Sequence, residues 1–593
     1  MKSFFSPFLD AIRHLGIFRN LPEYFDPSER RLVFQSVVIG VVVWGVVYAL
    51  KVTVHDVFHE LLHWLESLPS LLFVFIPLIF GALIVAYLAG NWSTHVHYRD
   101  KKGKLHELND VEGDGLERAI SLYYASEPTL EQSLLGKEGV DVRWEMPTFT
   151  LAARKFLATL VTLGSGGSGG LEASVTLIGE SVSAGLFKPR RVVRRADERN
   201  NLFRRMWRWW RSSDPDDLQT AQLGGIAAAV STLLGAPFAA AFFAVEVMYR
   251  RRPIIEKLIY ALISSLIAYF LTNLVTGGHP AIFEVDALPP PPNTGGYFLV
   301  VLLVASLVSL VSLYFNRMHH SFERLFQELN VRDWQRHVIG AGITGVIAVV
   351  VAYSAEHWLG YEHGLELVIG PGEGAIHAAL DGKLTLTLAV IALFAKLFAT
   401  LATIASGGSA GLLVPSIFLG TMVAAGAAPV FGYEPVTLII PAMAASLVSI
   451  VNVPLAATLF IVEVFGAAYI LPALMTLVVT SILAHENSIY RTQREEYDDR
   501  QILPGYSVRR VEIPESWGEK TIVDLRIRNR FDINVIGILE QTTQDGTFFP
   551  HVQINPSMSD VLRAGDRLVV LGKDEKLDAF EREVAKERKV GRP

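Results

Sequence analysis

One acidic residue, Glu172, lies in a stretch that otherwise offers mainly glycine, serine and leucine. Residues 164–174 read GSGGSGGLEAS and follow the apolar run 155–163. Glycines leave backbone N–H groups uncovered and let a ligand approach the backbone closely. If a helix resumes at Glu172, its unpaired N–H groups and positive dipole end point at the break, which suits an anion. A carboxylate there can compete with the anion, so Glu172 is a candidate gate that protonation would open.

The same pattern occurs twice. Residues 155–174 read KFLATLVTLGSGGSGGLEAS, and residues 396–415 read KLFATLATIASGGSAGLLVP, with Leu413 in the place of Glu172. Short, glycine-interrupted apolar segments at matching positions in two halves indicate an ion site near the middle of a membrane. Tight helix contacts through small residues would explain single glycines, but they would not require the whole pattern twice. These two repeated stretches offer backbone amides rather than several acidic side chains, which disfavours a cation carrier.

Composition indicates a polytopic membrane protein. Of the 593 residues, 51% are hydrophobic and 19% are charged, which is unlike a soluble enzyme. The chain has no cysteine, so disulfides, thiol redox centres and cysteine-ligated metals are excluded. We expect no removable signal peptide, since residues 1–20 lack an uninterrupted apolar stretch.

A second repeated unit supports two related halves. Residues 234–248 (LGAPFAAAFFAVEVM) and 451–465 (VNVPLAATLFIVEVF) share a proline, small residues and Val-Glu-Val. The predicted layout has these parts: first spans at 33–53 and 69–90, a polar loop at 92–146, related halves at 148–275 and 384–485, and apolar segments at 297–316 and 337–353 between them. The arginine-rich stretch 188–211 predicts a cytoplasmic, membrane-anchoring segment.

Composition changes after Tyr490. From residue 507 the pattern is that of a small α/β domain, with expected strands at 507–513, 533–541 and 566–572 and a terminal helix at 575–588. The predicted organisation is an N-terminal cytoplasmic segment 1–32, a membrane domain 33–490, a linker 491–506 and a C-terminal domain 507–593.

The motifs resemble those of the CLC chloride channel and transporter family over about residues 33–495. Gly170–Ser174 (GLEAS) resembles the family's Gly-Arg-Glu-Gly-Pro motif, Gly411–Pro415 (GLLVP) its Gly-x-Phe-x-Pro motif, and HENSIYRTQ the end of its last helix. The resemblance implies an all-α polytopic membrane protein with an inverted repeat of broken, re-entrant helices, followed by a small α/β domain.

The resemblance also implies roles for single residues. Glu172 matches the gating glutamate, and Lys155 matches a lysine whose charge would favour anion occupancy. The expected chloride contacts are the amides of Leu171, Glu172, Ala173, Leu412 and Leu413 and the hydroxyl of Tyr490. Asp114, in Gly113–Glu117, is the best match to a serine that normally touches the anion, and an ionised aspartate there would repel chloride.

A further position concerns coupling to protons. The resemblance places Val247 where exchangers carry an inner glutamate, with Glu246 one residue earlier. A valine there favours passive, channel-like chloride flow. A chloride/proton antiporter in which Glu246 substitutes, and a transporter of fluoride or another anion, are the alternatives.

The C-terminal domain resembles a TrkA-C module, which implies dimer support and regulation by a small ligand. We expect a homodimer in the cell membrane, with the C-terminal domain cytoplasmic. Chloride is the expected substrate, and no cofactor, metal or nucleic acid is expected.

Two enzyme motifs compete with transport. His59, Glu60 and His63 form H-E-x-x-H, with His55 one turn earlier, which in a metalloprotease binds zinc. Gly166–Gly170 matches G-x-S-x-G around Ser168, but that motif needs a preceding strand and a partner histidine. Neither context is predicted here, so the chain is not expected to be an enzyme.

Overall fold

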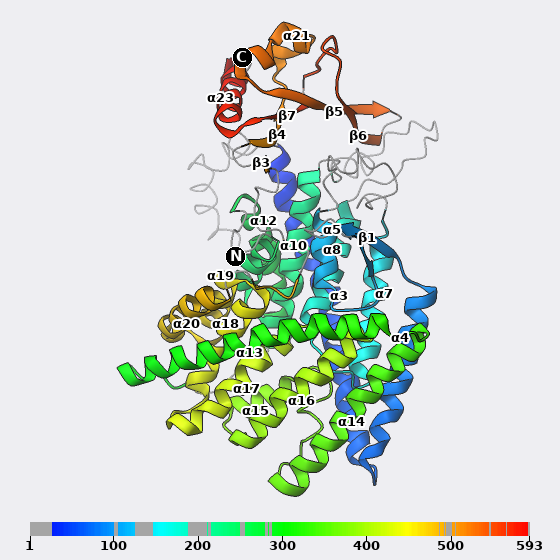
Figure 1. Ribbon diagram of the computed structural model, residues 1–593, viewed down its shortest axis with the longest axis vertical. Coiled ribbons are helices and arrows are strands. Elements are labelled where there is room, and N and C mark those ends of the chain that lie inside the picture. The colour runs from blue at the N-terminus through cyan, green and yellow to red at the C-terminus, as the bar shows by residue number, and fades with distance from the viewer. Residues whose placement is uncertain are drawn as a thin grey trace, which may run out of the picture.

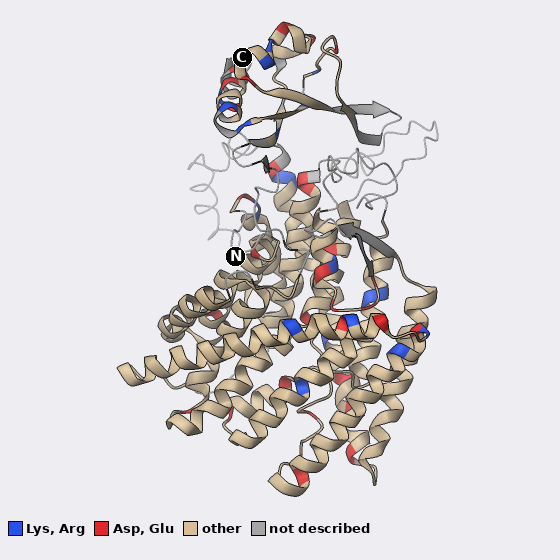
Figure 2. Ribbon diagram, in the orientation of Figure 1, with Lys and Arg blue, Asp and Glu red and all other residues tan. Residues whose placement is uncertain are grey.

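The structure is a computed structural model. It describes residues 27–99, 105–124, 146–187, 210, 215–248, 255–278, 283, 288–484, 487–490, 493, 501–503, 506–544, 547–564 and 566–590. Helices dominate up to residue 483, and a small sheet domain lies at one end of the long axis (Figure 1). Charged residues are sparse along the helices (Figure 2). Seven helices in the described part are long and apolar enough to cross a membrane.

The helical part consists of two series of elements. The first series is α3 (Pro27–Glu66), η1 (Leu71–Val74), α4 (Phe75–Asn91), β1 (His95–Arg99), β2 (Leu105–Asn109), α5 (Leu116–Tyr124), α7 (Phe149–Gly164), α8 (Glu172–Phe187), α10 (Pro215–Leu234), α11 (Pro237–Glu246) and α12 (Ile255–Val275). The second is α13 (Gly295–Glu328), α14 (Asp333–Leu359), α15 (Glu373–Leu380), α16 (Leu386–Ala405), α17 (Leu413–Phe431), α18 (Pro435–Val451), α19 (Pro454–Phe465), η4 (Ala467–Tyr469) and α20 (Ile470–Leu483).

The two series match element by element. Each has a pair of long helices, a short helix, two helices around a glycine break, and then a helix pair joined at a proline. The central helices α8 and α17 are buried along nearly their whole length, whereas α12 leaves large apolar side chains such as Leu274 exposed. A helix that is apolar all round belongs inside a bundle or against lipid. The fold predicted from the sequence is therefore confirmed, and the repeat extends to α3 and α13.

Some predicted boundaries are wrong. The first span does not stop at residue 53, because α3 continues to Glu66 with His55, His59 and His63 on its exposed side. The polar loop predicted at 92–146 contains the hairpin β1–β2 and the buried helix α5. The basic stretch 188–211 lies outside the described residues except for Trp210, whose ring packs on Phe187 with centroids 5.1 Å apart.

Two glutamates cap helices of the opposite half. Glu246, at the end of α11, accepts hydrogen bonds from the N–H groups of Leu455 (3.1 Å) and Ala456 (3.0 Å) at the start of α19. Glu463, in α19, accepts from the N–H groups of Phe238 (2.9 Å) and Ala239 (2.7 Å) at the start of α11. Both α11 and α19 begin with a proline, which has no N–H. Each glutamate therefore binds the N–H groups of the two residues after the proline, and its negative charge interacts favourably with the helix dipole.

We expect Glu246→Ala to lower the melting temperature more than Glu463→Ala does. Glu246 is fully buried, while Glu463 is partly exposed. Losing a buried acceptor leaves amides unpaired, which costs about 1–3 kcal/mol. Thermal unfolding of the detergent-solubilised variants measures this difference. Equal melting temperatures for Glu246→Ala and the unmodified chain would show that the reciprocal caps do not stabilise the fold.

The C-terminal part has its own hydrophobic core. Its sheet has the strand order β3-β4-β7-β5-β6, and the described pairs are antiparallel. The elements are β3 (Gln501–Leu503), β4 (Tyr506–Glu512), η6 (Glu515–Trp517), α21 (Ile522–Leu525), α22 (Ile527–Phe531), β5 (Asn534–Gln544), β6 (Thr547–Ile554), β7 (Arg567–Lys573) and α23 (Asp574–Val590). The three predicted strands and the terminal helix are present, and β3, β6, α21 and α22 were not predicted.

At the start of α21 a reciprocal cap forms. The hydroxyl of Thr521 and its N–H donate to Asp524 at 2.7 and 3.0 Å, and these hydrogen bonds hold the pKa of the Asp524 carboxyl below its usual range. This cap fixes the point after η6 at which α21 begins.

Candidate anion site

The two glycine breaks lie side by side. The N–H of Gly170 donates to the carbonyl of Gly411 at 2.7 Å, and the N–H of Gly411 donates back at 2.5 Å. A Cβ at Gly411 would lie 2.8 Å from the amide nitrogen of Ala173 and 3.0 Å from the carbonyl oxygen of Gly170. Glycine is therefore required at this crossing, which joins the two halves where both chains leave helical geometry.

The serines of the repeats hold the crossing from both sides. Ser168 donates its N–H to the hydroxyl of Thr403 (3.2 Å), and its own hydroxyl pairs with that of Thr400 (3.0 Å), both on α16. Ser409 makes the matching pair of bonds to the corresponding threonines of α7, at 3.0 and 2.9 Å. Ser168 thus has a structural partner and no histidine among the described residues to activate it, which argues against the serine-protease reading.

Helices α8 and α17 begin directly after the crossing. In the described part of the chain, no backbone carbonyl accepts from the N–H groups at these two starts, namely those of Leu171, Glu172, Ala173, Leu412 and Leu413. The first N–H groups of a helix lack partners within the helix, and its dipole adds positive charge there. The five amides predicted as chloride contacts therefore lie at two neighbouring helix ends.

The Glu172 side chain is buried at this place. The residue has no exposed surface, and neither carboxylate oxygen has a hydrogen-bond partner of good geometry among the described groups. The carboxylate lies over Gly170 and interacts with its own backbone N–H at the start of α8 and with that of Val414 at the start of α17. In this conformation the carboxylate takes the position at the helix end that an anion would take.

Asp114 and Tyr490 meet the same region from another side. Asp114 Oδ1 accepts from the N–H groups of Leu116 (3.1 Å) and Glu117 (3.5 Å) and so caps α5, while Oδ2 has no partner among the described residues. The Tyr490 hydroxyl is also buried, and it faces the Asp114 carboxylate closely enough to interact with it, although no hydrogen bond of good geometry joins the two; it also lies within electrostatic reach of Glu172. Buried polar groups are normally hydrogen-bonded. Because Asp114, Tyr490 and Glu172 all lack well-formed hydrogen bonds among the described residues, this region is a candidate site for an ion or water.

Lys155 holds the loop that carries Asp114. Its buried ammonium donates to the carbonyls of Gly113 (2.6 Å) and Val111 (3.4 Å). In the other half, Lys396 donates in the same way to the carbonyls of Gly370 (2.6 Å) and Val368 (3.2 Å). Each lysine therefore orders the loop before a short helix, in addition to placing a positive charge near the crossing.

Comparison with known proteins agrees with this geometry. The family described as voltage gated chloride channel matches residues 126–485, and the TrkA-C domain matches residues 508–585. The chain belongs to the voltage gated chloride channel (CLC) family. Its C-terminal domain is of the TrkA-C type, as the resemblance implied.

The curated relatives are distant. The chain is 24% identical over 315 residues to the H(+)/Cl(-) exchange transporter ClcA of Vibrio campbellii, covering 50% of this chain and 64% of the relative. It is 25% identical over 288 residues to the H(+)/Cl(-) exchange transporter ClcA of Yersinia pestis, which covers 46% of this chain and 57% of the relative. The chain thus spans less than two thirds of the length of either relative.

Solved structures share the fold. A slow cyanobacterial Cl-/H+ antiporter superposes with a TM-score of 0.60 at 17% identity, covering 79% of this chain and 99% of that one. A CLC-type fluoride/proton antiporter superposes with a TM-score of 0.56 at 20% identity and covers the same shares of the two chains. A eukaryotic CLC transporter superposes with a TM-score of 0.55 at 15% identity, covering 79% of this chain and 74% of that one.

One buried acidic residue near Glu172, Glu373, was not predicted from the sequence. It begins α15 and lies within electrostatic reach of Glu172, of Lys51 on α3 and of His55. A signal for it exists: Gly370–Gly374 (GPGEG) precedes Lys396 as Gly113–Glu117 (GDGLE) precedes Lys155. The repeat therefore includes the loops before the short helices.

The proposed proton-pathway positions lie at the end of α11. Val247 is fully buried and offers no titratable group. Both carboxylate oxygens of Glu246 bind the start of α19, as described above. Glu246 therefore has a structural task that competes with a role as a proton carrier.

The H-E-x-x-H residues do not form a compact metal site. His55, His59 and His63 are exposed along α3, with ring centroids 6.1 and 4.6 Å apart in sequence order. Among the described residues no third ligand converges on them. This arrangement argues against the metalloprotease reading.

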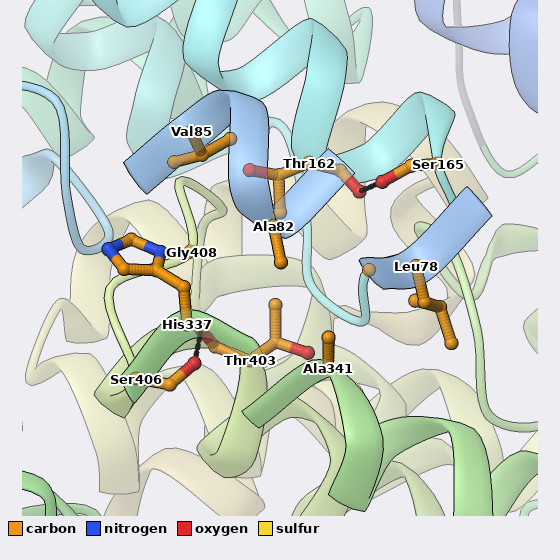
Figure 3. A pocket seen from close by; sticks show the side chains of 11 residues that line it. Leu78, Ala82, Val85, Thr162, Ser165, His337, Ala341, Thr403, Ser406 and Gly408 are labelled. Carbon is orange, nitrogen blue, oxygen red and sulfur yellow. Dashed lines mark hydrogen bonds between the residues drawn. The ribbon is translucent and has the colours of Figure 1, made fainter. Parts of the chain in front are cut away.

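A small cavity lies beside the crossing (Figure 3). It is lined by matching residues of the two halves, with Thr162 and Ser165 of the first half facing Thr403 and Ser406 of the second. The two serine hydroxyls donate to the carbonyls of their threonines, at 3.1 and 3.0 Å. Glu172 is not part of its lining. The cavity is therefore lined by both repeats and does not include the candidate gate.

Proposed function

We propose that the chain transports chloride across a membrane through a path between α8 and α17, gated by Glu172. The observation that carries this is the meeting of two helix starts, whose first amides bind no backbone carbonyl, around one buried carboxylate that interacts with N–H groups at both starts. Backbone amides and dipole ends can replace the hydration shell of a small anion without a charged side chain. The relatives named as H(+)/Cl(-) exchange transporters support chloride as the substrate.

The gate works by competition. The ionised Glu172 carboxylate occupies the positive end of α17, so chloride and carboxylate exclude each other there. Protonation removes the charge and weakens the attraction to the amides. Chloride then enters, and the neutral side chain leaves the path. Flux should therefore rise as pH falls.

Passive flow is the mode that the residues at the end of α11 favour. Val247 cannot carry a proton, and Glu246 is engaged as a helix cap. With valine at position 247 and Glu246 engaged as a cap, one protonatable gate gives pH-dependent chloride flow without obligatory proton exchange.

Chloride/proton exchange is the second candidate. It is supported by the names of the curated relatives and by a second buried acid, Asp114, whose Oδ2 forms no hydrogen bond of good geometry among the described residues. Fluoride or another small anion is an alternative substrate, since the amides do not select an anion by charge.

Chloride efflux from liposomes with simultaneous pH recording separates the two modes. For passive flow we expect chloride efflux with no proton movement against its gradient. Uphill proton movement driven by a chloride gradient would establish exchange. Absence of efflux for chloride and for fluoride would contradict the transport proposal as a whole.

We also propose an oligomeric state, a membrane location and a role for the C-terminal domain. The chain acts as a homodimer in a cell membrane, with the TrkA-C domain on the cytoplasmic side supporting the dimer and binding a small regulatory ligand. The exposed apolar side chains of Phe270, Leu274 and Ile482 provide surface for lipid or for a second copy. No cofactor is needed for this function, which is transport rather than catalysis.

A further inference from the structure

A cluster of side chains of metal-binding types lies on α13, a helix that contributes neither of the two helix starts of the candidate anion site. His319 Nε2 lies 3.3 Å from Glu323 Oε1, and His320 Nδ1 lies 3.5 Å from Glu323 Oε2. In the described part of the chain it is the one group of three histidine, aspartate or glutamate residues whose ligand atoms all lie within 4.8 Å of one another. The function proposed above does not use it.

The surroundings of this cluster are short of hydrogen-bond partners. His319 is 6% exposed, and its Nδ1 has no partner among the described residues. One and two turns earlier on the same face, the side chains of Asn316 and Ser312 are also buried and unpartnered there. Because buried polar groups normally find partners, this face of α13 indicates an occupant such as a water or an ion.

The separations suit a transition metal. Zinc binds imidazole nitrogen and carboxylate oxygen at about 2.0–2.2 Å, so neighbouring ligand atoms of a tetrahedral site lie about 3.3 Å apart. The two nitrogen–oxygen distances on α13 are close to this value. A plain ion pair explains one histidine next to the carboxylate. Two imidazoles sharing one carboxylate are better explained by a common cation, which both can bind in the neutral form.

We propose that His319, His320 and Glu323 bind a divalent transition-metal ion of the zinc class, leaving at least one coordination position open. Imidazole ligands suit zinc, copper, iron and nickel better than magnesium or calcium. The half-exposed side chains of His320 and Glu323 give the ion an entry route, and the buried ring of His319 anchors it.

The location connects the metal site to the anion path. His319 lies within electrostatic reach of Asp114 and of Glu117 at the start of α5. A dication on α13 would attract an anion that passes Asp114 and would hold it there. Metal binding should therefore slow chloride efflux.

Metal binding is measured on the purified full-length chain in detergent, with an affinity tag that contains no histidine. Cobalt(II) absorption, followed by displacement with Zn2+, reports both geometry and stoichiometry. We expect one ion per chain with the visible bands of low-coordinate cobalt. The absence of cysteine removes thiolate as a competing ligand.

Two variants test the ligands separately. His320→Ala and Glu323→Gln should each weaken Zn2+ binding at least about tenfold, because loss of even an outer-shell partner costs this much. Both side chains are partly exposed, so the fold should survive, which the melting temperature checks. His59→Ala, in the exposed histidine row of α3, is the matched control and should bind as the unmodified chain does.

The outcomes are decisive in both directions. Absence of stoichiometric binding, or unchanged binding in both ligand variants, would overturn the proposal, as would an equal loss in His59→Ala. Efflux that is slowed by Zn2+ in the unmodified chain but not in His320→Ala supports the link to the anion path, and metal binding without any effect on efflux would overturn that link. Because binding is read without transport, its failure is distinct from failure of the proposed chloride transport.

Discussion

Replacing Glu172 by glutamine is expected to raise chloride efflux and to remove most of its pH dependence. The amide keeps the shape of the carboxylate but carries no charge, so it no longer competes with chloride for the start of α17. Efflux from liposomes should then be nearly the same at acidic and neutral pH, whereas the unmodified chain should be faster at acidic pH.

A matched control is available on the same helix. Glu180 is also fully buried in α8, but its carboxylate accepts hydrogen bonds from Gln222 (2.6 Å) and Ser181 (2.7 Å). Glu180→Gln should leave the pH dependence of efflux in place. If Glu172→Gln keeps the pH dependence of the unmodified chain, Glu172 is not the gate.

Removing the charge of Asp114 is expected to strengthen chloride binding. At an effective dielectric constant of 20, two like charges 4 Å apart repel by about 4 kcal/mol. Even a third of that repulsion, about 1.4 kcal/mol, corresponds to tenfold in affinity. Asp114→Asn keeps an oxygen to cap α5, so the charge is the main thing that changes. Calorimetric titration with chloride measures the effect.

The neighbouring acid Asp110 provides the comparison for this prediction. It is buried in the same loop, but it pairs with Arg154 at 3.1 Å and accepts from the N–H of Thr94 at 2.8 Å. Asp110→Asn should change chloride affinity little. Equal chloride affinity in Asp114→Asn and the unmodified chain would mean that Asp114 does not face the anion or is already neutral.

The glycine breaks allowed much of the helical fold and the site to be predicted from sequence. The repeated stretches 155–174 and 396–415 contain the lysine, the glycines and the helix starts, and the structure brings both stretches together at Gly170 and Gly411. Glu172 was singled out from this repeat, whereas the amide contacts and the role of Lys155 were inferred from the resemblance to the CLC family. Local sequence was sufficient because each break is built by its own glycines.

Features that depend on contacts between distant residues were not predicted. The cap of α19 by Glu246 joins residues about two hundred positions apart, and no local pattern marks it. Glu373 was missed because the shorter repeat did not include the matching loops before the short helices. The end of α3 was misjudged for another reason: its polar histidines lie on the exposed side, so a drop in hydropathy did not end the helix.

The central claim is that an anion binds at the starts of α8 and α17, and its most direct test is to locate a halide in crystals of the protein. We expect anomalous scattering from bromide-soaked crystals to give a peak at the starts of α8 and α17, against the amides of Leu412 and Leu413 and near the Tyr490 hydroxyl. The peak should strengthen in Glu172→Gln, where the carboxylate no longer competes. Bromide found only on surface cations, with none at the two helix starts in either protein, would contradict the account.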